Sequence, residues 1–518
     1  MMLLWLLLIP LACGILAWLS ERLHPNLPRL ISLAGLTVPL GMASASWFNS
    51  REGFLFSGGP WLAEVSFPWI PHWGVSIHLA MDGMSLLLVV LTFFLGCISV
   101  VSSWTEVKER VGFFHLNLMA ILTGITGVFL AIDLFLFYFF WELMLVPMYF
   151  LILLWGHENR RHAAMKFFIF TQMGGLLMLL SILGLYFIHG GISGEYTFDY
   201  SRLLGTPVGA IPAFWLMMGF VAAFAVKLPV VPLHTWLPDA HTEAPTAGSV
   251  ILAGLLLKTG AYGLMRFAVP FFPSAAASVA APAMVLGVIG ILYGAVMTFS
   301  QTDMKRLVAY TSVSHMGFVL LGIFAWNTIA LQGVIMQIIC HGIGTGALFV
   351  IVGILQERVH TRDMERMSGL QAQAPRMAGV AVFFALASLG LPGLGNFVGE
   401  FLVLLGAVRI SIPITAAASA GLIFATVYSL WMIQKVFHGP ALTRPGREAA
   451  AISDLSLRES FVLGVMIVSL VWLGLFPQPV LDTAGIGIDN VRRAHASAGE
   501  HRQPQPEVIS RGGVHAGR

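Results

Sequence analysis

The sequence predicts an all-α polytopic membrane protein with about fourteen transmembrane helices. The chain has 518 residues, of which 57% are hydrophobic and only 10% are charged. An ordinary soluble domain is about one-quarter charged. Apolar runs recur along the chain between charge clusters and Pro or Gly breaks, and each is about 20 residues long, the length that crosses a bilayer as a helix. The composition therefore excludes a water-soluble globular protein.

The apolar runs are centred near residues 10, 38, 93, 121, 145, 176, 220, 256, 288, 314, 342, 390, 422 and 467. They predict a transmembrane domain over residues 1–480. No Lys or Arg precedes the first run, whereas a cleaved signal peptide begins with a basic segment, so we expect a retained membrane helix. Residues 481–518 are rich in Arg, His, Gln and Pro, a composition that predicts a polar, mobile C-terminal tail.

The basic residues are distributed unevenly between alternate loops. One set of loops holds 17 Lys and Arg residues, and the other holds only 4, namely Arg51, Arg202, Arg266 and Arg409. Because Lys and Arg are retained on the cytoplasmic side of a membrane, this asymmetry predicts an even number of spans and places both termini in the periplasm.

Several classes of site are excluded by composition and spacing. The net charge of +3 is small and its basic residues are scattered, which argues against a nucleic-acid surface. Cys13, Cys97 and Cys340 lie too far apart for a CxxC metal or iron–sulfur motif. The chain also has no Walker A loop and no GxGxxG between a strand and a helix. We therefore expect neither a cofactor nor a metal ion in this chain.

Six ionisable side chains fall inside predicted spans, near the middle of the membrane: Glu142, Lys227, Lys258, His315, His341 and Glu400. A charge at the bilayer centre costs at least about 2.5 kcal/mol, so such residues face a partner or a water-filled cavity. A single one is explained equally well by a static buried pair or an interhelical hydrogen bond. Six of them on different helices predict a relay of proton stations, because a scaffold has no reason to bear that cost repeatedly.

The residue types suit proton transfer. His titrates near neutral pH, and moving a carboxylate toward or away from a buried ammonium switches it between holding and releasing a proton. Glu142 is the candidate partner of Lys227.

Two spans are interrupted beside ionisable residues. The seventh is broken at residues 228–232, next to Lys227, and the twelfth at residues 391–393, before Glu400. Broken helices at corresponding positions of two halves indicate an inverted-repeat transporter. Because the breaks are five spans apart, they predict two inverted five-helix repeats, at about residues 113–270 and 277–436.

The linker at residues 232–245 contains His234 and His241 and is open to interpretation as a metal site. Its prolines break the helical register that paired His ligands use, so a polar connection at the cytoplasmic mouth is the preferred interpretation. Asp82 is expected to cap a helix, and Asp303 is expected to be a loop charge.

The central motif resembles a known family. Residues 227–229, 232–241, 244–246 and 257–260 read KLP, PLHTWLPDAH, APT and LKTG. This pattern closely resembles the signature of the antiporter-like membrane subunits of respiratory complex I, which are similar to chains of multi-subunit Na⁺/H⁺ antiporters and membrane-bound hydrogenases. Glu400 in the broken twelfth span resembles the M-type chains, the counterparts of mitochondrial subunit 4, because the L-type and N-type chains carry Lys there.

The resemblance implies a role for each site residue. Glu142 and Lys227 would be the ion pair that gates proton loading, Lys258 the central relay, His315 and His341 its continuation through bound water, and Glu400 the outlet. The reaction would be NADH oxidation by quinone coupled to proton translocation. FMN, iron–sulfur clusters and quinone would lie in other subunits, and L-type and N-type chains would be neighbours in a bacterial plasma membrane.

Two alternatives remain at this point. The chain could instead serve a cation/proton antiporter or a membrane-bound hydrogenase, whose polar cores would look alike. It could also be a purely structural scaffold, which predicts that Glu142→Gln or Lys227→Ala leaves pumping intact.

Overall fold

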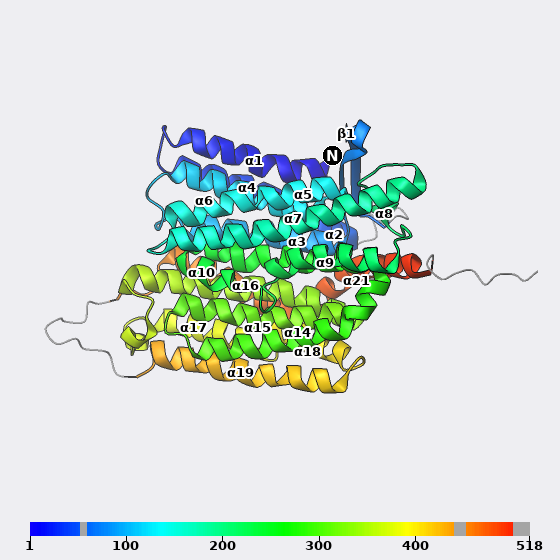
Figure 1. Cartoon of the computed structure of the whole chain (residues 1–518). Helices are drawn as coiled ribbons and strands as arrows, with labels where there is room; N and C mark the ends of the chain where they lie inside the picture. Colours follow the sequence, from blue (N-terminus) through cyan, green and yellow to red (C-terminus); the bar gives the residue numbers. More distant parts are fainter. Residues whose placement is uncertain (52–59, 440–451, 501–518) are drawn as a thin grey trace, which may run out of the picture.

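The computed structural model describes residues 1–51, 60–439 and 452–500, and it confirms the predicted all-α membrane architecture. Thirteen helices in this part of the chain are long and apolar enough to cross a membrane. They lie side by side in one bundle (Figure 1). The helices of the first half are α1 (Met2–Ser20), α2 (Leu27–Arg51), α3 (Gly83–Ser102), α4 (Val111–Leu130), α5 (Leu134–Leu143), α6 (Leu145–Trp155), α7 (Arg160–Ser193), α8 (Tyr200–Leu203), α9 (Ala210–Lys227) and α10 (Trp236–Glu243).

The second half of the chain contains two interrupted regions among its membrane helices, one within residues 246–271 and one at residues 389–394. Its helices are α11 (Thr246–Ile251), α12 (Leu257–Gly263), α13 (Val269–Phe271), α14 (Pro273–Phe299), α15 (Met304–Ala325), α16 (Thr328–Val359), α17 (Pro375–Ser388), α18 (Gly395–Ala407), α19 (Ile412–Phe437), α20 (Leu457–Leu475) and α21 (Gln478–Glu500). Two π-helical segments, Leu252–Leu256 and Leu264–Ala268, join α11, α12 and α13 into one apolar span.

Both predicted breaks are present. Helical structure stops at Lys227 and resumes at Trp236, and it stops again at Ser388 and resumes at Gly395. Proline at positions 229 and 392 lacks the N–H that continues a helix. A further interruption, at Met144 between α5 and α6, was not expected from the sequence.

Side chains cap several helices at the ends of the bundle. Asp82 accepts a hydrogen bond from the Ser85 amide and caps α3, as predicted. Asp133 accepts from two amides at the start of α5. Asp303, expected to be a loop charge, caps α15. Each cap satisfies an amide that the helix itself leaves unpaired.

A two-stranded antiparallel hairpin, β1 (Ala63–Ile70) and β2 (Val75–Met81), precedes α3. The helical periodicity of the sequence did not predict it. Its turn ends at Gly74, whose φ of 65° favours glycine. Figure 1 shows the hairpin upright at one end of the bundle, beside the N-terminus.

The C-terminal region differs from the predicted polar tail. Residues 481–500 form most of α21, and residues 501–518 lie outside the described part of the chain. Val480, Ala484, Ile488 and Val491 are buried, and their spacing of three to four residues places them on one helix face. This apolar face packs against α3 and α16, which explains why the first part of the tail is an ordered helix.

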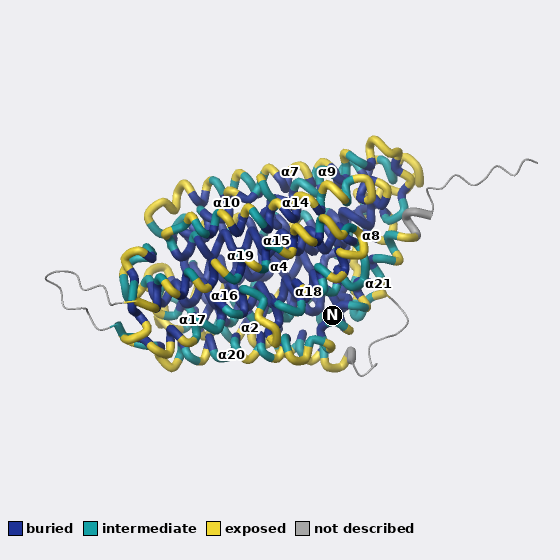
Figure 2. The backbone as a smooth tube through the Cα atoms, turned by 90° about the horizontal axis from the view of Figure 1, so that it is seen from below, coloured by how far each residue is buried: buried dark blue, intermediate teal, exposed yellow. Residues whose placement is uncertain are grey.

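The buried core runs along the middle helices. α4, α15 and α16 are buried over most of their length, whereas the rim of the bundle is exposed (Figure 2). The exposed rim carries large apolar side chains, including Leu180, Phe187, Trp215 and Phe461. Such a surface suits lipid rather than water.

Candidate functional site

Lys258 and His341 form a buried pair between α12 and α16. The Lys258 ammonium donates to the Ala253 carbonyl over 2.5 Å and lies 2.8 Å from His341 Nδ1. Neither side chain is exposed. Ala253 belongs to the π-helical segment just before α12, and π-helical turns occur frequently at functional sites.

His315 and Glu400 form a second buried pair, between α15 and α18. His315 Nδ1 lies 3.0 Å from Glu400 Oε1, and each side chain is only 2% exposed. Gln337 of α16 donates to the same carboxylate oxygen over 3.0 Å. On the far side of the imidazole ring, His315 Nε2 lies 3.2 Å from Ser388 Oγ and 3.5 Å from the Tyr428 hydroxyl.

The two pairs adjoin one another through their imidazole rings. The ring centroids of His315 and His341 are 5.6 Å apart. Lys258, His341, His315 and Glu400 therefore follow one another in a continuous buried row, contributed by α12, α16, α15 and α18. The structure thus brings together four of the six predicted site residues.

Glu142 and Lys227 lie at a separate location. They attract each other electrostatically, but Glu142 Oε1 and Lys227 Nζ each lack a hydrogen-bond partner among the described residues. Tyr138 and Gln172 lie beside the carboxylate. In this conformation the implied ion pair is therefore not joined by a hydrogen bond.

Aromatic rings enclose the Lys227 ammonium. Its Nζ lies 5.3 Å from the ring centre of Trp141 and 5.5 Å from that of Phe167, at distances where a ring face attracts a cation. The stem of Lys227 packs against Gly260, two residues past Lys258, where an added Cβ would lie 3.2 Å from the Lys227 Cβ. Lys227 thus sits beside α12 without a hydrogen bond to the row.

The linker histidines pack against aromatic rings. His241 stacks on Phe349 with ring centres 4.6 Å apart, and His234 meets Tyr293 edge-on at 5.1 Å. Within the described ranges, no cluster of three His, Cys, Asp or Glu side chains is arranged to hold a metal ion.

A polar cluster lies at the end of the bundle that was predicted to be cytoplasmic. Lys305, counted as a loop residue in the sequence, is fully buried in α15 and donates to the Ala244 carbonyl over 2.8 Å. His157 Nε2, in the α6–α7 loop, lies 3.2 Å from Lys305 Nζ. Burial and the nearby cations, Lys305 first, lower the pKa of His157 to about 3. His157 is therefore a neutral acceptor at physiological pH.

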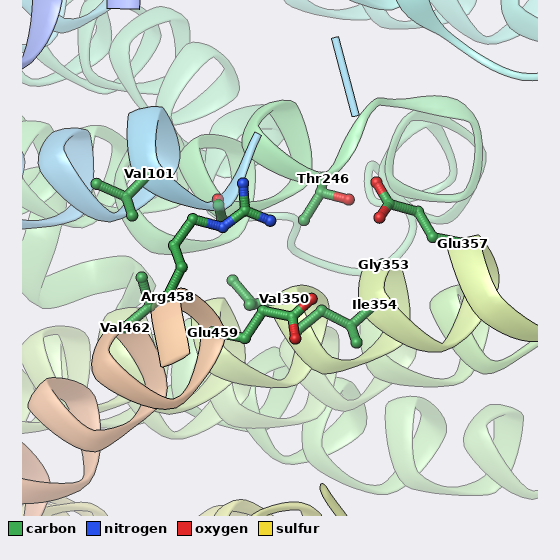
Figure 3. Close-up of a pocket in the computed structure, with 10 residues that line it drawn as sticks. Val101, Thr246, Val350, Gly353, Ile354, Glu357, Arg458, Glu459 and Val462 are labelled. Carbon is green, nitrogen blue, oxygen red and sulfur yellow. The ribbon is translucent and has the colours of Figure 1, made fainter. Parts of the chain in front are cut away.

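A small pocket lies near this end, between α3, α16 and α20 (Figure 3). Its volume is about 10 Å³, and its polar lining is contributed by Ser102, Thr246, Glu357, Arg458 and Glu459. Such a volume holds about one water molecule, so the pocket is too small for an organic cofactor.

The opposite end of the bundle holds a buried ion pair. Arg266, assigned to a loop from the sequence, lies inside a π-helical segment and pairs with Asp82. The Arg266 side chain is 2% exposed and that of Asp82 is not exposed. Arg266 follows an apolar run, so the sequence does not show that it is buried unless its partner is known. That partner is 184 positions away.

A second ionic cluster at that end joins the hairpin to the loop after α7. His78 of β2 lies 2.6 Å from Asp199 through Nδ1 and 2.8 Å from Glu64 through Nε2. Burial opposes protonation of His78, but the two carboxylates outweigh it and raise the pKa of the imidazole. The His78 contact in turn lowers the pKa of Asp199 against the effect of its burial.

Sequence reasoning missed the residues that contact the row, chiefly Gln337, Ser388 and Tyr428. One signal for Gln337 was available. It lies four residues before His341, and residues four apart share a helix face. Ser388 and Tyr428 carry no comparable signal, because neither is spaced at a helical interval from a predicted site residue.

Comparison with known proteins identifies relatives over nearly the full chain. Residues 131–426 match the family described as NADH:quinone oxidoreductase/Mrp antiporter, transmembrane. The chain is 52% identical over 500 residues to NADH-quinone oxidoreductase subunit M of Escherichia coli strain K12, which covers 95% of this chain and 98% of that protein.

Solved structures have the same fold. A chain of respiratory complex I from Thermus thermophilus with bound NADH has a TM-score of 0.83 and 31% identity, covering 95% of this chain and all of that chain. A chain of the Mrp complex from a Dietzia species also has a TM-score of 0.83, with 21% identity over 97% of this chain and 99% of its own length. The second likeness shows a shared fold alone.

Proposed function

This chain belongs to the NADH:quinone oxidoreductase/Mrp antiporter transmembrane family, among the M-type subunits of complex I, and we propose that six ionisable side chains within its membrane helices, five of them buried and Glu142 partly buried, carry protons through the membrane arm. It is a multi-pass inner-membrane subunit of the proton-translocating oxidoreductase, and other complex I subunits are its partners. What we propose is the route within this chain.

The observation that carries the proposal is the row Lys258, His341, His315 and Glu400. Two of its three steps are hydrogen-bond contacts, at 2.8 Å and 3.0 Å, and the third joins two imidazole rings 5.6 Å apart. Four ionisable groups in one buried row are costly to bury. A static scaffold would satisfy the same helix contacts with apolar residues.

Each step is a proton transfer between named atoms. Lys258 Nζ–H gives its proton to His341 Nδ1, which leaves a neutral amine and an imidazolium. The imidazolium loses a proton from Nε2, which has no hydrogen-bond partner among the described side chains. His315 receives this proton on Nε2 and becomes an imidazolium, while His341 returns to a neutral imidazole. His315 Nδ1–H then gives its proton to Glu400 Oε1, forming a carboxylic acid and a neutral imidazole.

Glu142 and Lys227 would control loading of this row. When the carboxylate approaches Lys227, the ammonium holds its proton, and when the carboxylate withdraws, the proton is released toward Lys258. Glu142 Oε1 and Lys227 Nζ share no hydrogen bond, and aromatic rings surround the Lys227 ammonium. Both observations support a conformation in which the carboxylate is withdrawn from Lys227. The role of both residues follows the family resemblance.

The redox chemistry would belong to other subunits. We propose that FMN, the iron–sulfur clusters and the quinone site lie in partner chains and that L-type and N-type antiporter-like chains flank this one. We also propose that both termini are periplasmic, on the basis of the Lys and Arg asymmetry. The paired breaks after Lys227 and before Glu400 support two inverted five-helix units.

The deciding experiment reconstitutes the whole complex in vesicles and measures proton uptake per NADH oxidised with a pH-sensitive dye. Lys258→Met removes the proton carrier while keeping the length of the side chain, so we expect pumping to fall about tenfold or more. Lys435→Met is the matched control, because Lys435 lies on α19 against Trp431, away from the row. Normal pumping by the Lys258→Met complex would refute the relay.

The description of the matched family also names Mrp antiporters, which supports one second candidate, a subunit of a cation/proton antiporter driven by ion gradients. Purification of the intact assembly distinguishes the two functions. Iron–sulfur subunits and NADH:quinone activity would support the first function, whereas small membrane partners alone would support the second.

A further inference from the structure

The two oxygens of the Glu400 carboxylate have different surroundings. Oε1 lies 3.0 Å from His315 Nδ1 and accepts a hydrogen bond from Gln337 Nε2, also over 3.0 Å. Oε2 has no hydrogen-bond partner among the described residues. It faces Gly390, where an added Cβ would lie 2.8 Å from it. Gly390 belongs to the break between α17 and α18, so one oxygen contacts the relay and the other faces the break.

Gln337 is held firmly in its place on α16. Its side chain has no exposed surface, and it packs against Gly399 of α18, where an added Cβ would lie 2.7 Å from the Gln337 Cα. Its amide oxygen has no hydrogen-bond partner in the described part of the chain. A buried polar side chain with an unpaired oxygen is costly, so packing alone does not account for glutamine at this position.

We propose that Gln337 is the positioning residue for Glu400, and that its amide N–H holds Oε1 against His315 while Oε2 stays turned toward the break between α17 and α18. This inference rests on the proposed relay and deepens it. Gln337 itself never carries the proton.

The chemistry of the hydrogen bond explains how the proton moves on. An amide N–H binds a carboxylate more strongly than a carboxylic acid, because the charged acceptor strengthens the bond. When His315 Nδ1–H gives its proton to Oε1, the N–H bond breaks, an O–H bond forms and the carboxylate charge disappears. The hydrogen bond from Gln337 then weakens. The carboxylic acid group can now rotate so that its O–H points toward Gly390, which has no side chain.

A double-mutant cycle in the reconstituted holocomplex tests the proposal. The four proteins are wild type, Gln337→Met, Glu400→Gln and the double variant, and the readout is protons pumped per NADH oxidised. Met keeps the length of Gln without the N–H donor. Gln332→Met is the matched control, because Gln332 lies on the same helix and, among the described residues, hydrogen-bonds to the Leu481 carbonyl rather than to the row. If Glu400→Gln leaves no measurable pumping, Glu400→Asp replaces it as the background.

We expect Gln337→Met to lower pumping about fivefold in the wild-type background and to cause no further loss when Glu400 is already changed, since residues that act as one unit are not additive. Gln332→Met should pump normally. Full pumping by Gln337→Met, an equal loss in both backgrounds, or an equal loss in Gln332→Met would each overturn the positioning role. Full pumping by Glu400→Gln would instead overturn the relay itself, so the two failures are distinguishable.

Discussion

His315 Nδ1 lies 3.0 Å from Glu400 Oε1 although the two residues are 85 positions apart in the chain. Both side chains are buried. The contact joins α15 to α18 directly beside the break that precedes α18. It connects the imidazole end of the buried row to an acid whose second oxygen faces the interrupted backbone between α17 and α18.

Removing the imidazole should interrupt proton transfer across this contact without changing the acid. We expect His315→Gln to lower proton pumping about tenfold, because glutamine can keep a hydrogen bond to Glu400 but cannot bind and release a proton. The measurement is dye-detected proton uptake by reconstituted complex. His162→Gln, at the start of α7, is the control, and equal pumping by the two variants would contradict the role of His315.

Changing the loading acid should have a similar effect. Glu142→Gln removes the charge that attracts Lys227 while keeping the shape of the side chain, so we expect pumping to fall at least about fivefold. We expect NADH oxidation with an artificial acceptor to be unchanged, because we have proposed that the redox centres lie in other subunits. Glu158→Gln, in the α6–α7 loop, serves as control. Unchanged pumping by Glu142→Gln would favour the scaffold hypothesis.

Removing one partner of the buried Asp82–Arg266 pair should strongly destabilise the protein. Breaking a buried ion pair by removing one partner costs about 3–5 kcal/mol, because the other charge is left buried alone. We expect Arg266→Met to reduce the amount of assembled complex and its thermal unfolding temperature. The double variant Asp82→Asn with Arg266→Met should recover part of the loss. A double variant less stable than either single variant would contradict this explanation.

The ionic cluster of His78, Asp199 and Glu64, which joins the hairpin to the loop after α7, should be sensitive to pH. The raised pKa of His78 means that its stabilising contribution is fully present below the unfolded pKa of about 6.5 and is lost as the pH rises through the folded value. The lowered pKa of Asp199 means that its contribution is lost only as the pH falls through that lowered value. The contact is therefore strongest between these two limits.

Hydrogen exchange of the β1 and β2 amides, corrected for intrinsic rates, measures how strongly this ionic cluster stabilises the hairpin. We expect protection to fall as the pH is raised from about 6 to about 9. His78→Gln should show no such change. A pH dependence that persists in His78→Gln would assign the effect to another group.

Much of the fold could be predicted because each membrane span is a local feature. Apolar runs separated by charges and Pro–Gly breaks gave the helix positions, including the interruptions after Lys227 and before Gly395. The hairpin and the interruption at Met144 were missed because strand pairing and tertiary packing, rather than local hydropathy, decide them. α21 was missed because its apolar face is narrow and depends on contact with α3 and α16.

The sequence by itself determined which side chains are costly to bury, because the energy of a charge in an apolar span depends on residue type and surroundings along the chain. Only the tertiary structure decided which of them meet. It joined Lys258 to His341 and His315 to Glu400, left Glu142 and Lys227 without a hydrogen bond to each other, and added Gln337. Distances of a few ångströms between separate helices are set by packing of the whole bundle, and the linear order of residues does not contain them.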